Sequence, residues 1–394
     1  ILFETFPKEE QASAQGFFGA IVIAGPVIGP TLGGYIVTNV GWRWIFFINV
    51  PVGIAATMLC ASALPPDGVL AKRTPVDWTA IILLALGLGA LQTFLEEGYS
   101  EDWFDSTFIC VSAALSVVAI VLFVVRQLEA EHPVVDLRVL RHRSLWAGSL
   151  LSVVIGMALY GALFAVPIFA STVMHYTAQQ VGLMMLPGAL GSAFTMVIAS
   201  KLVRRFDPRV LLAIGALILV TSVLWLGRLT TTTSASDLFW PLLVRAFGTV
   251  LMFLPLNMAA LGPIPKQDIA AASAFYNLTR QLGGSVGVAI LSTILGSRTA
   301  FHRSVLVEHL VVSDPSVQAR VAGMTASFAA KGADAATAKQ QAMTILDGSA
   351  RLQSSVLAFN DTFFVTALLV LVSIPLVLLL GRPSAGAKVE AGAH

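Results

Sequence analysis

The chain has 394 residues, of which 56% are hydrophobic and only 12% charged, and its formal net charge is +2. The charged share is about half of that in soluble globular domains, which argues against a soluble enzyme and against a disordered protein. Lys and Arg are dispersed among hydrophobic blocks, which argues against nucleic-acid binding. With a mean hydropathy of +0.82, the sequence predicts an integral membrane protein.

Ten hydrophobic segments are long enough to cross a hydrocarbon core of about 30 Å, which takes about 20 residues per helix. The alternation typical of membrane strands is absent, so we expect a bundle of helices. In chain order, the predicted spans are residues 12–37, 44–64, 78–95, 107–125, 145–173, 181–198, 210–226, 238–261, 270–295 and 363–380.

The basic residues predict the orientation of these spans, because short cytoplasmic loops collect Lys and Arg. If the chain starts in the cytoplasm, fourteen basic residues fall on that side, whereas the short outer loops hold only Arg43 and Arg228. We therefore expect a multi-pass protein of the plasma (inner) membrane with both ends in the cytoplasm.

The first span carries a pattern of small residues and prolines. Gly25, Gly29 and Gly33 share one helix face, where another helix can approach closely, and Pro26 and Pro30 bend the helix. Such a helix fits a seam between two bundles that rock against each other, and an ordinary packing or dimer face is the alternative. The full motif comprises Gly16, Gly25, Gly29, Pro30, Gly33 and Gly34.

Two connections stand out by composition. Residues 133–143 alternate apolar and charged side chains, which predicts a short amphipathic helix on the inner surface. Residues 298–360 form a long outer loop in which Asp314-Pro315 and Asp334 precede alanine-rich stretches. We expect an ordered or partly helical cap here, and a flexible connection is the alternative.

The ninth span carries an arginine deep in the membrane. Arg280 lies about 15 Å into its span at 1.5 Å per residue, and Asn277 and Gln281 flank it. A charge at this depth costs about 2.5 to 3.5 kcal/mol on insertion scales. We expect these residues to face a polar cavity that binds substrate or supports the transport cycle, and pairing with backbone carbonyls or snorkelling is the alternative.

The eighth span offers a second group of candidate cavity residues. Arg245 lies toward the outer side, and Phe253 and Asn257 could contact a lipophilic molecule. Snorkelling of Arg245 and plain packing of the other two are the alternatives.

An inner loop with mixed charge lies between the sixth and seventh spans. Asp207 stands among Arg204, Arg205 and Arg209, which predicts charge-assisted bonds that latch helix ends in one state. The alternative is simple enrichment of positive charge on the inner side, which does not explain Asp207.

Residues for catalysis or metal binding do not cluster in the sequence. No Asp or Glu falls in the middle of a predicted span, the histidines lack paired spacing, and Cys60 and Cys110 stand in apolar runs. We therefore expect no enzyme activity, no metal site and no cofactor.

Four motifs carry a resemblance to a known family. The pattern from Gly16 to Gly34 resembles the antiporter motif in the fifth helix of major facilitator superfamily exporters. Residues 41–51 resemble the entry to the sixth helix of the fourteen-span drug:proton antiporters of the EmrB/QacA type, and residues 277–289 are similar to their thirteenth helix. Residues 201–209 resemble a degenerate copy of the superfamily's inner-loop motif, and the likeness covers essentially the whole chain.

The resemblance implies an all-α major facilitator bundle in which about ten helices are present and the first four of the family are missing. Its expected parts are the last two helices of the N-terminal bundle (1–64), two central extra helices (65–126), a cytoplasmic linker (127–144), a six-helix C-terminal bundle (145–381) with its outer loop (298–360), and a cytoplasmic tail (382–394). The family's first-helix aspartate, which is implicated in proton coupling, has no position in this sequence.

The resemblance also implies a function, namely proton-coupled export of lipophilic or cationic small molecules by two rocking bundles. The implied partners are the small-molecule substrate, protons and the lipid bilayer. Family members in cells with two membranes can also work with a periplasmic adaptor protein. An exporter of one metabolite or antibiotic and a non-transporting membrane fragment are the alternatives, while the residues disfavour a membrane enzyme or a channel.

Overall fold

The computed structural model describes residues 14, 29–63, 77–130, 133–203, 205–265, 267–308, 310 and 314–380, and in these ranges all regular structure is helical. Nine helices of the described residues are long and apolar enough to cross a membrane. They correspond to the second through tenth predicted spans. The first predicted span, 12–37, lies largely outside the described residues, although residues 29–39 are helical.

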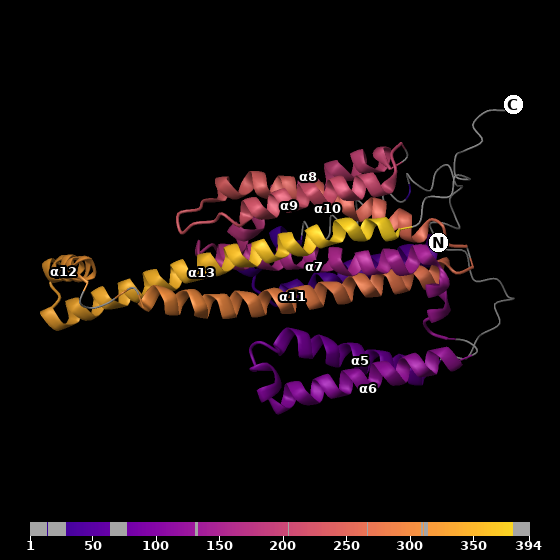
Figure 1. Ribbon diagram of the computed structural model, residues 1–394, viewed down its shortest axis with the longest axis horizontal. Coiled ribbons are helices and arrows are strands. Elements are labelled where there is room, and N and C mark those ends of the chain that lie inside the picture. Colours follow the sequence, from indigo (N-terminus) through magenta and orange to yellow (C-terminus); the bar gives the residue numbers. More distant parts are fainter. Residues whose placement is uncertain are drawn as a thin grey trace.

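The two helices of residues 77–130 form a hairpin. Asp77 starts α5 (Trp78–Glu97) by accepting a hydrogen bond from the Ala80 amide, and η1 (Trp103–Asp105) leads into α6 (Thr107–Glu129). The hairpin lies apart from the main bundle, next to α11 (Ile269–Glu308), as Figure 1 shows. Ser285 Oγ of α11 donates a hydrogen bond to Gln92 of α5 over 2.6 Å, which places a polar contact between hairpin and bundle. Before the hairpin come α3 (Trp44–Phe47) and α4 (Asn49–Ala63).

Six long helices form the main bundle and enclose an apolar core. α7 packs against α11 and α13, while α10 packs against α8 and α9 (Figure 1). Phe169 of α7 meets Phe359 of α13 edge to face, with ring centroids 5.3 Å apart. Besides α11, the bundle consists of α7 (Arg143–Thr172), α8 (Ala178–Leu202), α9 (Pro208–Leu226), α10 (Ala235–Leu261) and α13 (Ala335–Leu376). The short helix η3 (Val377–Leu379) follows α13.

Glycines hold α7 and α11 in backbone contact. A Cβ added at Gly156 would lie 2.3 Å from the carbonyl oxygen of Arg280, and one at Gly283 would lie 2.4 Å from that of Val153. Only small residues permit helices to approach this closely. The contact fixes the rotation of α11 about its axis and thereby the direction of the Arg280 side chain.

The predicted outer loop, 298–360, is mostly helical. α11 continues to Glu308, α12 covers Pro315–Ala330, and α13 begins at Ala335. Asp314 and Asp334 cap α12 and α13, which are the two helix starts that the sequence indicates. The segment thus consists largely of two spans that continue beyond the bundle, with α12 near their tip (Figure 1).

The short helix predicted within residues 133–143 is a five-residue 3₁₀ helix, η2 (Leu137–Arg141), which covers only part of that segment. Asp136 starts this turn and α7 begins at Arg143, which leaves no room for a longer helix. Val139 is 2% exposed, so the linker is anchored by a side chain in the core of the bundle.

Candidate substrate cavity

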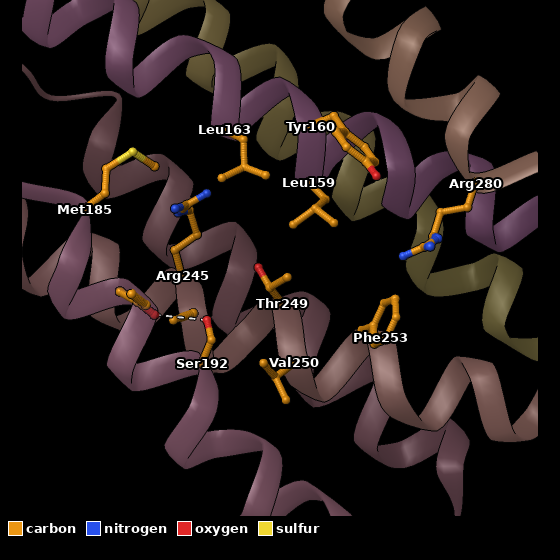
Figure 2. Close-up of a pocket in the computed structure, with 13 residues that line it drawn as sticks. Leu159, Tyr160, Leu163, Met185, Ser192, Arg245, Thr249, Val250, Phe253 and Arg280 are labelled. Atoms are coloured by element: carbon orange, nitrogen blue, oxygen red, sulfur yellow. Dashed lines mark hydrogen bonds between the residues drawn. The ribbon is translucent and has the colours of Figure 1, made fainter. Parts of the chain in front are cut away.

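A cavity of about 150 Å³ lies between α7, α8, α10 and α11 of the main bundle. Figure 2 shows two arginine side chains, Arg245 and Arg280, that reach into it from different helices. The rest of the lining is apolar or weakly polar, and none of its residues is acidic: Leu159, Tyr160, Leu163, Met185, Gly188, Ala189, Ser192, Ala246, Thr249, Val250 and Phe253. The cavity therefore combines an apolar wall with two positive charges.

Arg245 is the more deeply buried of the two arginines. It is 9% exposed, and its Nε has no hydrogen-bond partner among the described residues. Snorkelling, the alternative stated for Arg245, would place its guanidinium in water at the membrane interface. The burial of the side chain contradicts that alternative.

Arg280 has partners on two helices. Its Nη2 donates a hydrogen bond to Asn277 Oδ1 over 3.0 Å, and its guanidinium carbon lies 5.0 Å from the ring centroid of Phe253. This second contact is a cation–π interaction between α11 and α10. Arg280 is therefore held by Asn277 of its own helix and by Phe253 of α10.

The other predicted cavity residues lie outside the lining. Asn277 is exposed and also donates a hydrogen bond to the carbonyl of Ser273, so it supports Arg280 without lining the cavity. Gln281 is exposed, and Asn257 is half-buried on α10 one turn beyond Phe253. The structure thus brings together Arg245, Phe253 and Arg280 and leaves the three amides at the margin or outside.

Sequence reasoning missed Tyr160, which lines the cavity together with Arg280 (Figure 2). A Cβ added at Gly284 would lie 2.4 Å from the Tyr160 ring, so the glycine makes room for the tyrosine. The signal available in the sequence was the run of glycines in α11, which marks a close helix contact but does not say which side chain fills it.

The small-residue helix of residues 29–39 contacts the start of α8. A Cβ added at Gly34 would lie 2.2 Å from the carbonyl oxygen of Ala178, and one at Gly182 would lie 2.6 Å from that of Pro30. Thr31 Oγ1 donates a hydrogen bond to the Gly182 carbonyl over 2.8 Å. At Gly34 and Gly182 the backbones of the two helices are therefore in contact, and the Thr31 side chain adds a hydrogen bond.

Gly34, a member of the predicted motif, makes that contact, whereas Gly29 and Gly33 lie on another face of the helix. A Cβ added at Gly29 or Gly33 would meet no atom of the described residues within 4 Å. Gly34 lies one residue beyond Gly33 and therefore about 100° around the helix, so the predicted glycine row does not face α8. Gly16 and Gly25 lie outside the described residues.

The predicted latch around Asp207 is not formed in the described residues. Asp207 caps α9 by accepting a hydrogen bond from the Arg209 amide over 2.9 Å, and Arg205 is exposed. The guanidinium of Arg209 donates to the carbonyl of Leu380, at the end of η3. Aspartate before a proline at the first helical position is a common helix start, which explains Asp207. Arg204 lies outside the described residues.

A different acidic residue makes ion pairs at this end of the bundle. Asp268, just before α11, accepts a hydrogen bond from Arg141 over 2.9 Å and contacts His142 Nε2 at 3.0 Å. The hydrogen bonds from His142 and then from Arg141 lower the pKa of the Asp268 carboxyl. These contacts tie the linker to the start of α11, and they could not be predicted from the sequence because the partners are more than 120 residues apart.

The comparison with protein families matches residues 1–288 to the Major Facilitator Superfamily. The chain is 30% identical over 402 residues to the multidrug export protein EmrB of Escherichia coli (strain K12), which covers 100% of this chain and 76% of that protein. It is 30% identical over 319 residues to EmrB of Haemophilus influenzae, and this match covers 81% of this chain and 62% of that protein. It is 28% identical over 383 residues to the fatty acid resistance protein FarB of Neisseria gonorrhoeae, with coverages of 97% and 74%.

These findings confirm the predicted fold class and the predicted family resemblance. The chain spans between 62% and 76% of the lengths of these three relatives. Its nine membrane-length helices in the described residues agree with a multi-pass integral membrane protein. The chain belongs to the major facilitator superfamily and is homologous to the EmrB-type multidrug exporters.

Proposed function

We propose that the protein is a proton-coupled exporter of lipophilic small molecules that works by alternating access. The observation that carries the proposal is the cavity between α7, α8, α10 and α11, with its apolar wall and its two arginines. An apolar wall with few polar groups is typical of small-molecule sites, in which burial supplies affinity and the polar groups orient the ligand. The relatives named for multidrug export and fatty acid resistance support the same conclusion.

The helix contacts suggest how the cavity could open to either side. α7 and α11 are in backbone contact and would move as one unit, while residues 29–39 touch the start of α8 through Gly34 and Gly182. Such a contact, with few side chains to repack, suits a boundary that shifts during rocking. Among the residues that line the cavity none is acidic, so we assign the proton-carrying group to a helix other than these four.

The proposal includes a location and a partner. We place the protein in the inner membrane with both ends in the cytoplasm, which the distribution of Lys and Arg supports. α12 and the adjoining ends of α11 and α13 then stand on the outer side. This extension projects beyond the bundle (Figure 1), and we propose it as the surface for a periplasmic adaptor protein.

Transport by the reconstituted protein tests the proposal. Proteoliposomes with an acidic lumen should accumulate fluorescent lipophilic probes, because protons leave as the probe enters. Nigericin, which exchanges H⁺ for K⁺, should abolish the accumulation. Accumulation that persists after nigericin would contradict proton coupling, and uptake of only one compound from a varied panel would favour the single-substrate alternative.

A further inference from the structure

Arg245 is a buried cation that the described part of the protein leaves without a counter-charge. It is 9% exposed, it lines the cavity, and its Nε has no hydrogen-bond partner in the part of the chain that the structure describes. Figure 2 shows its guanidinium in the cavity between Leu163 and Met185. An ionised group in such surroundings is costly unless an opposite charge or several hydrogen bonds accompany it.

The helices around the cavity do not supply that charge. Of α7, α8, α10 and α11, only α10 and α11 contain an acidic residue, namely Asp237 and Glu308. Asp237 lies eight residues before Arg245, about 12 Å along the helix, and its carboxylate is held by the backbone and side chain of Ser234. Glu308 is the last residue of α11, 28 residues beyond Arg280 and about 40 Å away along the helix.

The second arginine of the cavity has a different environment. Arg280 is oriented by Asn277 and by the ring of Phe253. Both partners are neutral, so the positive charge of Arg280 also acts on whatever enters the cavity. A lipophilic cation would meet two like charges there, and a lipophilic anion would meet two opposite ones.

We propose that the cavity selects lipophilic anions, with a carboxylate or an equivalent acidic headgroup on the guanidinium of Arg245. This inference rests on the proposed transport function and names the class of its substrate. The planar guanidinium can donate two parallel hydrogen bonds to a carboxylate, a geometry that Lys cannot provide. The apolar part of the ligand then lies against Leu163, Met185 and Phe253.

Binding of three matched probes to the purified chain tests this inference. Dansyl-labelled undecanoate, its primary amide and the corresponding amine share one apolar body and differ in the charge of the headgroup. We would titrate each into the full chain in nanodiscs of zwitterionic lipid at neutral pH and subtract binding to empty nanodiscs. The carboxylate should bind at least about tenfold more tightly than the amide, and the amine should bind more weakly than either.

Variants assign this preference to one side chain. Arg245→Gln should weaken carboxylate binding about tenfold and leave amide binding within about twofold, which removes the preference. Arg245→Lys keeps the charge but not the fork, so it should retain the order of affinities with a weaker carboxylate. Arg228→Gln is the matched control, because Arg228 is exposed and lies outside the cavity. A melting curve for each variant confirms that it is folded.

An anionic lipid could supply the same headgroup chemistry. Nanodiscs that contain phosphatidylglycerol distinguish the two sources, because lipid in the site would reduce carboxylate binding to the wild type but not to Arg245→Gln. Either source supports the anion site at Arg245.

Two results would overturn the inference. One is equal binding of the carboxylate, amide and amine, and the other is a carboxylate preference that Arg245→Gln leaves unchanged. Neither result bears on the accumulation driven by a pH gradient, so the transport function could stand while the substrate class fails. If gradient-driven accumulation were absent while carboxylate binding still depended on Arg245, the transport function would fail and the anion site would stand.

Discussion

Arg280 illustrates how a charge within a membrane helix is accommodated by neutral partners. Asn277 accepts a hydrogen bond from its Nη2, and the face of Phe253 lies 5.0 Å from its guanidinium carbon. Its Nε is buried and has no hydrogen-bond partner within the described ranges. The side chain therefore has both stabilising and destabilising contacts, and its net contribution to folding should be small.

Replacing Arg280 by Ala should affect transport far more than stability. The variant loses a cation–π contact worth about 0.5 to 2 kcal/mol and gains about 1 to 3 kcal/mol by removing an unpaired buried donor. We expect proton-driven accumulation to fall at least tenfold while the melting temperature moves by a few degrees at most. Failure of the variant to fold, measured by gel filtration and thermal unfolding, would assign Arg280 a structural role instead.

Among the cavity residues, the charged ones could be identified from the sequence. Arg245 and Arg280 stand out because an ionised side chain in an apolar run is costly, and both line the cavity. Tyr160 could not be identified in the same way, because an aromatic residue in an apolar helix usually belongs to the core. Whether Asn277 and Gln281 face the cavity depends on the rotation of α11 about its axis. That rotation is fixed by glycine contacts with α7, which hydropathy does not report.

The helices differ from the predicted spans mainly at their ends. Hydropathy located the part of α11 and α13 that is suited to lipid, but both helices continue through polar, alanine-rich sequence toward α12. Hydropathy measures compatibility with the bilayer and carries no information on where a helix ends in water. The caps at Asp314 and Asp334 marked the true starts, because an aspartate side chain satisfies the free amides of a first helical turn.

The start of α9 provides a test between a cap and a latch. Asp207→Ala removes the hydrogen bond to the Arg209 amide and should cost about 1 kcal/mol of stability. Asp207→Asn keeps an acceptor for that amide but removes the charge, so we expect nearly wild-type melting and transport. If Asp207→Asn impaired transport as much as Asp207→Ala, the charge itself would be needed and the latch would be the better account.

The contact between residues 29–39 and α8 predicts a contrast between two glycines of one helix. Gly34→Leu would place side-chain atoms against the Ala178 backbone, where even a Cβ would lie at 2.2 Å, so it should abolish transport or separate the helices. Gly29→Leu meets open space within the described residues and should keep at least half of the wild-type rate. Accumulation assays on folded variants compare them, and equal loss in both would contradict the assigned face.

In the molecule as a whole, the helix contacts hold the main bundle together around the cavity. Backbone contacts join α7 to α11 and residues 29–39 to α8, ion pairs tie the linker to the start of α11, and the cavity lies among four of the six helices of the main bundle. The α5–α6 hairpin lies outside this bundle and touches α11 through Gln92 and Ser285. We therefore propose that substrate binds inside the C-terminal bundle and that relative motion occurs at its borders.

A large side chain placed in the cavity tests whether substrate passes through it. Thr249 lines the cavity, whereas Thr221 lies on an exposed face of α9, so Thr249→Trp and Thr221→Trp insert the same bulk at matched residues. Accumulation of a lipophilic probe by proteoliposomes with an acidic lumen should be lost in folded Thr249→Trp and should be retained in Thr221→Trp. Wild-type accumulation by the Thr249→Trp variant would show that substrate does not pass through this cavity.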